Sequence, residues 1–339
     1  MPSGIHAVAV GIVGCGHWGR NYVRVMSELA ECRLIAFCDI DSAKLNEVSR
    51  QHPAAKTYHS FPEMLGNPEI EALVIATHAS SHYALARAAL SAGKDVLCEK
   101  PLAVDVREAE TLTKLAEQNG RILMVGHTFL YNRGIHKVKE LIRAREIGDI
   151  FFLKTVRSHL GLVREDVNVC WDLASHDLSI LNYLLEASPL KTHAVGSGFF
   201  KQGREDVAFI TLEYPKNILA NVHVSWADSN KQRTVEVVGS KGRIVFDDLN
   251  TLEPVRLYKR GTELKQNVDG WGDFKHQFRD GDIVSPKVEM REPLKEQCRH
   301  FFQSFHSRIP PLTDGRSGLE IVRIMAEIDE TLAKNRVLV

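Results

Sequence analysis

The sequence predicts an α/β protein of two domains, the first a doubly wound parallel sheet and the second an α+β domain with an open, mainly antiparallel sheet. Three observations support this prediction. The chain has 339 residues, whereas single cores stop growing at about 250 to 300 residues. Strand and helix patterns alternate strictly in the first part of the chain, and strand patterns dominate the rest. We therefore place one domain at residues 1–126 and the other at residues 127–339.

The composition excludes several classes of protein. Hydrophobic residues make up 44% of the chain and charged residues 25%, as in ordinary globular proteins. The 43 Lys and Arg residues balance the 43 Asp and Glu residues, so no long-range positive field attracts polyanions, and nucleic acid is not an expected partner. No apolar run reaches the roughly 20 residues that cross a bilayer, and residues 1–7 lack the start of a secretory signal. We expect a cytoplasmic protein with no membrane partner.

Cysteine and histidine do not indicate a metal site. The six cysteines lie far apart without a CxxC pair, and we expect them to be reduced and mostly buried. The 15 histidines are scattered, and no HExxH or similar ligand spacing occurs. The sequence therefore predicts no metal.

The first part of the chain alternates between apolar, β-rich runs and amphipathic stretches. We expect strands at residues 7–13, 33–39, 71–77, 94–99 and 121–129, and helices at residues 18–30, 42–52, 81–92 and 106–119. Strictly alternating strands and helices form right-handed crossovers, which build a parallel sheet covered on both faces.

The pattern changes after residue 132. We expect helices at residues 134–146 and 171–185 and strands at residues 150–159, 192–200, 207–214, 219–226, 233–238 and 243–247, with hairpin-like connections. Residues 261–290 show no sustained period and are expected to form a long loop. Two further helices, at residues 293–306 and 317–334, end the predicted structure.

A glycine-rich loop joins the first strand to the first helix. It reads Gly14-Cys15-Gly16-His17-Trp18-Gly19, and Asp39 ends the second strand about 20 residues later, which is the context that a Rossmann dinucleotide-binding site requires. Gly14 permits the tight turn, Gly16 lets the backbone approach a pyrophosphate, and Gly19 lets the helix pack closely. Asp39 would accept hydrogen bonds from the ribose and repel a 2′-phosphate, so NAD is favoured over NADP. The alternative is a purely structural turn in which Asp39 caps the next helix.

The fifth strand ends in Cys98-Glu99-Lys100-Pro101, at the carboxyl edge of the sheet. Ligands of open α/β sheets bind at this edge. A lysine there can donate a hydrogen bond to a substrate hydroxyl or to the nicotinamide ribose, and the proline prevents the strand from continuing. Taken alone, the motif is better explained by an exposed lysine at a strand end.

A second polar motif opens a helix in the second domain. Asp172 and His176 are four residues apart, which places both side chains on one helical face. Histidine titrates near neutrality and is a natural general base for an alcohol that loses hydride. The alternative is an amphipathic helix with a capping aspartate and a surface histidine.

Together these motifs resemble the glucose-fructose oxidoreductase and inositol dehydrogenase family, often written Gfo/Idh/MocA. The resemblance covers essentially the whole chain, including residues 235–242 and 293–310. It implies a Rossmann domain followed by an α/β domain with an open antiparallel sheet, NAD(P) as cofactor and a sugar or polyol as substrate. By position it implies that Lys100 contacts the substrate and the nicotinamide ribose, that His176 is the acid/base and that Asp172 orients the substrate.

The resemblance also assigns the segment after the third strand. Thr77 and His82 match the family's segment beside the cofactor, although His78 stands where a proline is usual. The cofactor-binding residues that we expect are Gly14, Gly16, His17, Trp18, Gly19, Asp39, Thr77, His82, Glu99 and Lys100.

Residues 126–133 and 166–168 look most like family members that oxidise sugar nucleotides, such as UDP-N-acetylglucosamine 3-dehydrogenases. Arg133, Arg157 and Arg164 would meet a diphosphate or be solvated or paired, while Trp171 and Trp226 would flank a sugar or pack in the core. The substrate-binding residues that we expect are Lys100, Tyr131, Arg157, Asn168, Asp172 and His176.

These inferences predict an NAD-dependent dehydrogenase that acts on a secondary hydroxyl of a sugar or sugar nucleotide, UDP-N-acetylhexosamine or a related compound being the first candidate. An inositol or free-sugar dehydrogenase is the alternative within enzymes, and a glycosidase that uses bound NAD needs the same machinery. A non-catalytic NAD-sensing regulator is the alternative from another class. An antiparallel sheet covered on one face leaves the other open to a partner, so we expect a homodimer or homotetramer.

Overall fold

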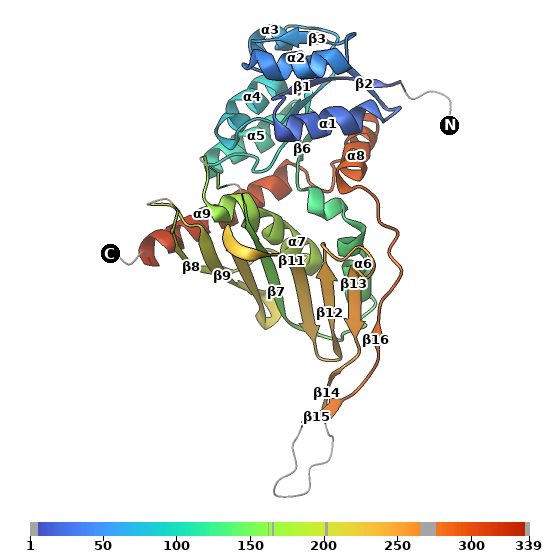
Figure 1. The fold of residues 1–339 in the computed structure, drawn as a ribbon, viewed down its shortest axis with the longest axis vertical. Helices are drawn as coiled ribbons and strands as arrows, with labels where there is room; N and C mark the ends of the chain where they lie inside the picture. Colours follow the sequence, from blue (N-terminus) through green and yellow to red (C-terminus); the bar gives the residue numbers. More distant parts are fainter. Residues whose placement is uncertain (1–5, 162, 165, 201–202, 265–275, 336–339) are drawn as a thin grey trace, which may run out of the picture. The chain divides into compact units, whose positions relative to one another are not determined.

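The computed structural model describes residues 6–161, 163–164, 166–200, 203–264 and 276–335, which Figure 1 shows as a ribbon. The chain divides into two compact units: residues 1–131 with 291–326, and residues 132–290 with 327–339. The sequence placed all of residues 127–339 in one domain. The difference arises because the chain returns to the first unit after residue 290, and a composition pattern does not reveal where a returning helix packs.

The first unit contains a six-stranded sheet in the order β3-β2-β1-β4-β5-β6, and every pair of neighbours is parallel. This is the strand order of a doubly wound dinucleotide-binding fold, as the sequence predicted. Its strands are β1 (Val8–Val13), β2 (Cys32–Cys38), β3 (Lys56–Tyr58), β4 (Ala72–Ile75), β5 (Asp95–Cys98) and β6 (Leu123–Val125). All residues of β1, β4 and β5 are buried, because helices cover both faces of a parallel sheet.

The helices of this unit begin where the sequence offers helix-capping side chains. Asp41 accepts a hydrogen bond from the Ala43 amide at the start of α2, and Asp105 accepts from the amides of Arg107 and Glu108 at the start of α5. The helices are α1 (His17–Ser27), α2 (Ser42–Gln51), α3 (Phe61–Leu65), α4 (Ala79–Ser91), α5 (Val106–Gln118) and α8 (Pro293–Ser307), with the 3₁₀ turn η1 (Thr128–Tyr131).

The second unit contains an eight-stranded sheet in the order β16-β13-β12-β11-β7-β10-β9-β8. Its pairs are antiparallel except β7 with β10, which is parallel. The strands are β7 (Ile150–Leu160), β8 (Lys191–Ser197), β9 (Val207–Tyr214), β10 (Ile218–Ser225), β11 (Ala227–Gly239), β12 (Gly242–Asp247), β13 (Val255–Tyr258) and β16 (Ile283–Val284). The mainly antiparallel sheet confirms the predicted fold class of this part of the chain.

Among the residues described, helices cover one face of this sheet. In Figure 1, α6 (Arg133–Arg143) and α7 (Ser175–Leu185) lie behind its strands. Along β9 the buried residues alternate with outward ones: Ala208, Ile210, Leu212 and Tyr214 are buried, whereas Phe209 and Thr211 are exposed. This two-residue period is that of a strand with one open face.

Three local expectations differ from the structure. Residues 121–129 were expected to form one strand, but β6 ends at Val125 and the 3₁₀ turn η1 follows. The helix pattern at residues 171–185 divides into a π-helical turn, η2 (Cys170–Ala174), and α7. In the expected loop at residues 261–290, β14 (Gly261–Leu264) pairs with β15 (His276–Arg279), while residues 265–275 lie outside the described part of the chain.

The last helix, α9 (Gly315–Asn335), begins in the first unit, and its residues from Glu327 onward belong to the second. Within the residues described, we find no helix long and apolar enough to span a bilayer.

Candidate active site

Each of the three glycines in the first loop is explained by a different feature of the local geometry. Gly14 adopts a φ of +89°, and a Cβ there would lie 2.6 Å from the Ala76 carbonyl oxygen. A Cβ on Gly19 would lie 1.8 Å from the Gly14 carbonyl oxygen, so the start of α1 packs directly on the turn. A Cβ on Gly16 would meet no atom within 4 Å. The space above Gly16 and the first-turn amides of α1, which no side chain caps, fit the approach of a pyrophosphate.

Asp39 connects the end of β2 to this loop. One carboxylate oxygen accepts a hydrogen bond from the Cys15 amide at 2.7 Å, and the other accepts from the Asp41 amide at 2.9 Å. Carboxylate oxygens can accept further hydrogen bonds, so these contacts leave capacity for a ribose hydroxyl. The next residue, Ile40, is 92% exposed, and the loop side chains His17 and Trp18 are also exposed.

The segments after β4 and β5 are held together by His82. Its Nδ1 lies 2.7 Å from the Pro101 carbonyl oxygen and its Nε2 lies 3.2 Å from the Thr77 carbonyl oxygen. The Thr77 hydroxyl is also hydrogen-bonded to the Ser81 hydroxyl at 2.7 Å. His78 stands where the family usually has a proline, and α4 begins at the next residue. His82 of α4 is held between the Thr77 and Pro101 carbonyl oxygens.

Lys100 and Glu99 are both buried, with 7% and 5% of their surfaces exposed. The Lys100 amide donates a hydrogen bond to a carboxylate oxygen of Glu99 at 3.2 Å. His127 is also buried, and burial together with the positive charge of Lys100 lowers the pKa of its imidazole to about 3. His127 is therefore neutral at physiological pH, and the first unit holds the cation of Lys100 in a largely buried polar environment.

In the second unit, Asp172 lies in the π-helical turn that precedes α7. The Ser175 amide donates to the Cys170 carbonyl oxygen, five residues back, and such turns occur frequently at functional sites. One oxygen of the Asp172 carboxylate accepts from Arg164 at 3.2 Å, and the other accepts from Trp226 Nε1 at 3.3 Å. These two donors fix the orientation of the carboxylate.

His176 is half-buried in the first turn of α7. The next residue, Asp177, forms a bidentate ion pair with Arg157 of β7, at 2.9 and 3.2 Å. Both partners are almost completely buried. Burial raises the pKa of Asp177, and the guanidinium of Arg157 opposes this effect. The ion pair fixes the start of α7 against the sheet and so fixes the backbone of His176.

The other expected substrate residues lie in more internal positions. Tyr131 is 4% exposed, and its hydroxyl is hydrogen-bonded to His300 and Thr313. Asn168 accepts a hydrogen bond from the Trp171 amide and donates to Glu205 and Asp329. Arg157 is in the ion pair with Asp177, so the polar groups of all three residues are already hydrogen-bonded to other side chains or to the backbone.

The sequence did not reveal the residues that hold the site residues in place. Arg164 was considered for a diphosphate, but it pairs with Asp166 as well as with Asp172. Trp226 was considered for stacking on a sugar, but it is fully buried and donates to Asp172. The position of Arg164 a few residues before the Asp172-xxx-His176 motif is the sequence feature that indicates its pairing with Asp172.

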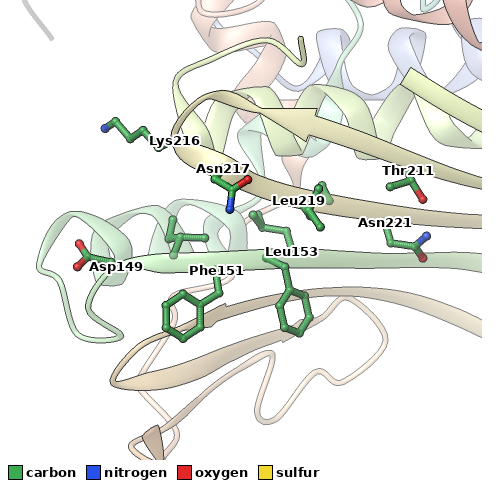
Figure 2. A pocket seen from close by; sticks show the side chains of 11 residues that line it. Asp149, Phe151, Leu153, Thr211, Lys216, Asn217, Leu219 and Asn221 are labelled. Atoms are coloured by element: carbon green, nitrogen blue, oxygen red, sulfur yellow. The ribbon is translucent and has the colours of Figure 1, made fainter. Parts of the chain in front are cut away.

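A hollow of about 640 Å³ lies on the second sheet. Figure 2 shows its lining side chains, which come from β7, β9, β10 and the segments beside them and include Phe151, Thr211, Lys216 and Asn221. None of the predicted site residues lines it.

Comparison with known proteins identifies the family. Residues 8–127 match the model described as "Oxidoreductase family, NAD-binding Rossmann fold", and residues 135–245 match the model of the GFO/IDH/MocA C-terminal domain. The chain belongs to the Gfo/Idh/MocA oxidoreductase family. The two matches meet near residue 130, and the first of them confirms that the first unit is an NAD-binding Rossmann domain.

Relatives within the Gfo/Idh/MocA family cover nearly the whole chain. A UDP-N-acetylglucosamine 3-dehydrogenase of Acidithiobacillus ferrooxidans is 24% identical over 319 residues, which is 94% of this chain and 95% of that protein. A myo-inositol 2-dehydrogenase of Thermotoga maritima is 23% identical over 320 residues, 91% of each chain. The crystal structure of GenD2, from gentamicin A biosynthesis, in complex with NAD has a TM-score of 0.83 at 21% identity, covering 98% of this chain and 97% of that one. At this identity, the structural likeness shows a shared fold.

Proposed function

We propose that this protein is an NAD-dependent dehydrogenase that oxidises a secondary hydroxyl of a sugar or sugar nucleotide. UDP-N-acetylhexosamine or a related compound is the first candidate substrate. The proposal rests on one observation: the chain combines a glycine loop open at Gly16 with the buried Lys100 and an Asp172 held by two donors four residues before His176. A binding module for NAD alone has no need of the last three residues.

The glycine loop and its neighbours would hold the cofactor. Backbone amides at the start of α1 face the pyrophosphate, and Asp39 accepts hydrogen bonds from the adenosine ribose. The remaining contacts would come from His17, Trp18, Thr77, His82, Glu99 and Lys100. When bound, NAD supplies the acceptor for the hydride that leaves the substrate carbon.

Three side chains would act on the substrate. His176 takes the proton of the hydroxyl group as its carbon loses hydride, so the carbon–oxygen single bond becomes a carbonyl and charge is conserved. Lys100 donates a hydrogen bond to the same oxygen. Asp172 accepts a hydrogen bond from the sugar, and Arg164 and Trp226 hold its carboxylate in the required orientation.

We propose that Tyr131, Arg157 and Asn168 hold other residues of the site in place. Each is hydrogen-bonded inside its own unit, and Arg157 acts on the substrate through Asp177 and the start of α7. Because Arg157 and Arg164 are paired with carboxylates, their charges do not favour a sugar nucleotide over a free sugar. The names of the relatives support both classes, since one acts on UDP-N-acetylglucosamine and another on myo-inositol.

The substrate class can be tested with purified protein, NAD and a panel of UDP-sugars, free hexoses and inositols, while NADH formation is followed by absorbance. Thermal shifts with each compound give a parallel measurement, because a bound ligand stabilises the native state. Turnover of a UDP-sugar supports the first candidate, and turnover of inositol or a hexose supports the alternative.

The acid/base assignment predicts the effect of His176→Ala. Turnover should fall by roughly 10²- to 10⁴-fold, as expected for loss of a positioned acid/base, while NAD affinity stays nearly unchanged. His136→Ala, on α6 of the same unit, is the matched control and should retain activity. An unimpaired His176→Ala enzyme would transfer the acid/base role to Lys100. Tight NAD binding without turnover of any sugar by the wild type would favour the regulator.

We also propose that the open face of the second sheet assembles copies of this chain into a homodimer or homotetramer. Outward residues of neighbouring strands bring apolar side chains together: Phe152 lies opposite Leu219, and both Val195 and His223 lie opposite Phe209. Phe209 and His223 stack with ring centroids 4.4 Å apart. Exposed apolar side chains gathered in this way favour association with a partner.

A further inference from the structure

A buried chain of hydrogen bonds in the first unit connects α1, the residue before Lys100, and α8. The Tyr22 hydroxyl donates to a Glu99 carboxylate oxygen at 2.7 Å, and the Gln297 side-chain amide donates to the Tyr22 oxygen at 2.9 Å. The Thr128 hydroxyl donates to the Gln297 carbonyl oxygen at 2.8 Å. Tyr22 and Gln297 are completely buried, so little solvent competes for the bonds of Tyr22 to Glu99 and Gln297.

The chemistry of the groups fixes the direction of the chain. An ionised carboxylate only accepts, so the Tyr22 hydroxyl must donate its proton to Glu99 and use a lone pair to accept from Gln297. The Gln297 carbonyl oxygen is then left to accept from Thr128. Burial and the negative charge of Glu99 both raise the pKa of Tyr22, which keeps the phenol protonated. Every donor in the chain therefore points toward Glu99 and stabilises its charged form.

The Glu99 carboxylate also has little room to move. A Cβ on Gly126, just after β6, would lie 2.9 Å from one Glu99 carboxylate oxygen and 3.2 Å from the Glu99 Cα. The other carboxylate oxygen accepts from the Lys100 amide at 3.2 Å. The carboxylate is thus held by Tyr22 on one oxygen, by the Lys100 backbone on the other, and by the close passage of the chain at Gly126.

We propose that Tyr22 is a positioning residue for Lys100, acting through the carboxylate of Glu99. The proposal rests on the function proposed above, in which Lys100 contacts the substrate. Tyr22 belongs to α1, the helix whose first turn forms part of the glycine loop. The same helix therefore presents its amides to the cofactor and, one and a half turns later, fixes the backbone from which Lys100 projects.

The test uses the conservative variant Tyr22→Phe, which removes one hydroxyl and keeps the buried ring. We expect kcat to fall roughly tenfold or more, because a small displacement of a catalytic group is costly in rate. The dissociation constant for NAD, measured by calorimetry, should stay within about twofold, since the glycine loop itself is unchanged.

A second measurement does not depend on turnover. The carboxyl group of Glu99 can be titrated by carbon NMR in protein labelled at glutamate, with its signal assigned from Glu99→Gln. Loss of a donor to the charged form raises a carboxyl pKa, so Tyr22→Phe should shift the titration upward by about one pH unit or more. Gln297→Met removes the donor to Tyr22 and the acceptor for Thr128 but leaves the Tyr22–Glu99 bond, so it should shift the titration less in the same direction.

Tyr214→Phe is the matched control. Tyr214 is a buried tyrosine of the second unit whose hydroxyl donates to Asn182 at 2.7 Å, so its loss should lower stability without moving kcat or the Glu99 titration. In a Glu99→Ala background, where no side-chain acceptor remains for the Tyr22 hydroxyl, Tyr22→Phe should have no further effect on kcat.

The outcomes separate the two proposals. A Tyr22→Phe enzyme with wild-type kcat and an unshifted Glu99 titration would overturn the positioning role while the dehydrogenase function stands. A wild-type protein that turns over no sugar would overturn the proposed function. In that case an unshifted Glu99 titration in Tyr22→Phe would still show that Tyr22 does not act on Glu99. If Tyr22→Phe does not fold, an unshifted titration in Gln297→Met overturns the positioning role.

Discussion

Asp39 has two tasks at the scale of a single residue. Its carboxylate accepts hydrogen bonds from the amides of Cys15 and Asp41, which ties the glycine loop to the end of β2. The same negative charge would repel the 2′-phosphate of NADP, and residues 40–43 contain no Lys or Arg to neutralise that phosphate. One side chain would therefore both shape the cofactor loop and select NAD over NADP.

This dual role predicts how Asp39→Ala changes cofactor affinity. NAD should bind more tightly than NADP to the wild type, and Asp39→Ala should narrow the difference by weakening NAD more than NADP. Calorimetric titration with both cofactors measures this. Asp39→Asn is the matched variant, because it removes the charge while an amide oxygen remains to accept from the loop. A wild-type preference for NADP would contradict the assignment.

His127 predicts a pH dependence of stability. Burial and Lys100 lower its pKa to about 3 in the folded protein, from the ordinary value of 6.5. Below pH 6.5 the unfolded chain binds a proton at this residue and the folded protein does not. The contribution of this residue to stability is therefore fully present above pH 6.5 and is lost progressively as pH falls toward 3. One such group costs about 2 kcal/mol between pH 7 and pH 5.

The measurement is the free energy of unfolding in urea between pH 5 and pH 7, for the wild type and for His127→Leu. As pH falls, the wild type should lose stability relative to His127→Leu, because the variant lacks the imidazole that only the unfolded state can protonate. His193→Leu, at an exposed position on β8, should leave the slope unchanged. Parallel curves for wild type and His127→Leu would contradict a buried neutral histidine.

At the scale of elements, the sequence predicts best what depends on neighbouring residues. The alternation of strands and helices and the glycine loop with Asp39 are local patterns, and the structure contains each of them. Short elements such as β3 and α3 were missed, because three to five residues carry too little periodicity to stand out.

Contacts between distant residues could not be predicted from one sequence. Gln297 and Tyr22 are 275 positions apart, and nothing near either residue indicates that they meet beside Glu99. Arg157 illustrates the same limit, since an arginine on a strand pattern is compatible with a solvated, a ligand-binding or a paired side chain. The fold decides among these, because α7 places Asp177 against β7 and the cost of an unpaired buried charge fixes the ion pair.

At the scale of the whole molecule, the helices described cover one face of the second sheet, and apolar residues occupy several outward positions on its other face. Phe152, Val195, Phe209 and Leu219 are each about half exposed, although strand propensity alone would allow polar residues at such sites. Burying these side chains in a second copy of the chain would remove them from water on both partners, which is the main driving force of stable association.

The open face therefore predicts an oligomer, and introducing one charged side chain on that face should weaken it. Sedimentation at micromolar concentration should show a dimer or tetramer, and Leu219→Asp or Phe209→Asp should shift it toward monomer, because a buried unpaired charge at the centre of an apolar interface is costly. Leu252→Asp is the control, since Leu252 is 90% exposed in the turn after β12. A monomeric wild type, or an assembly that survives both substitutions on the sheet, would show that the face stays in solvent. The apolar pairs Phe152–Leu219 and Val195–Phe209 would then stabilise only the sheet to which they belong.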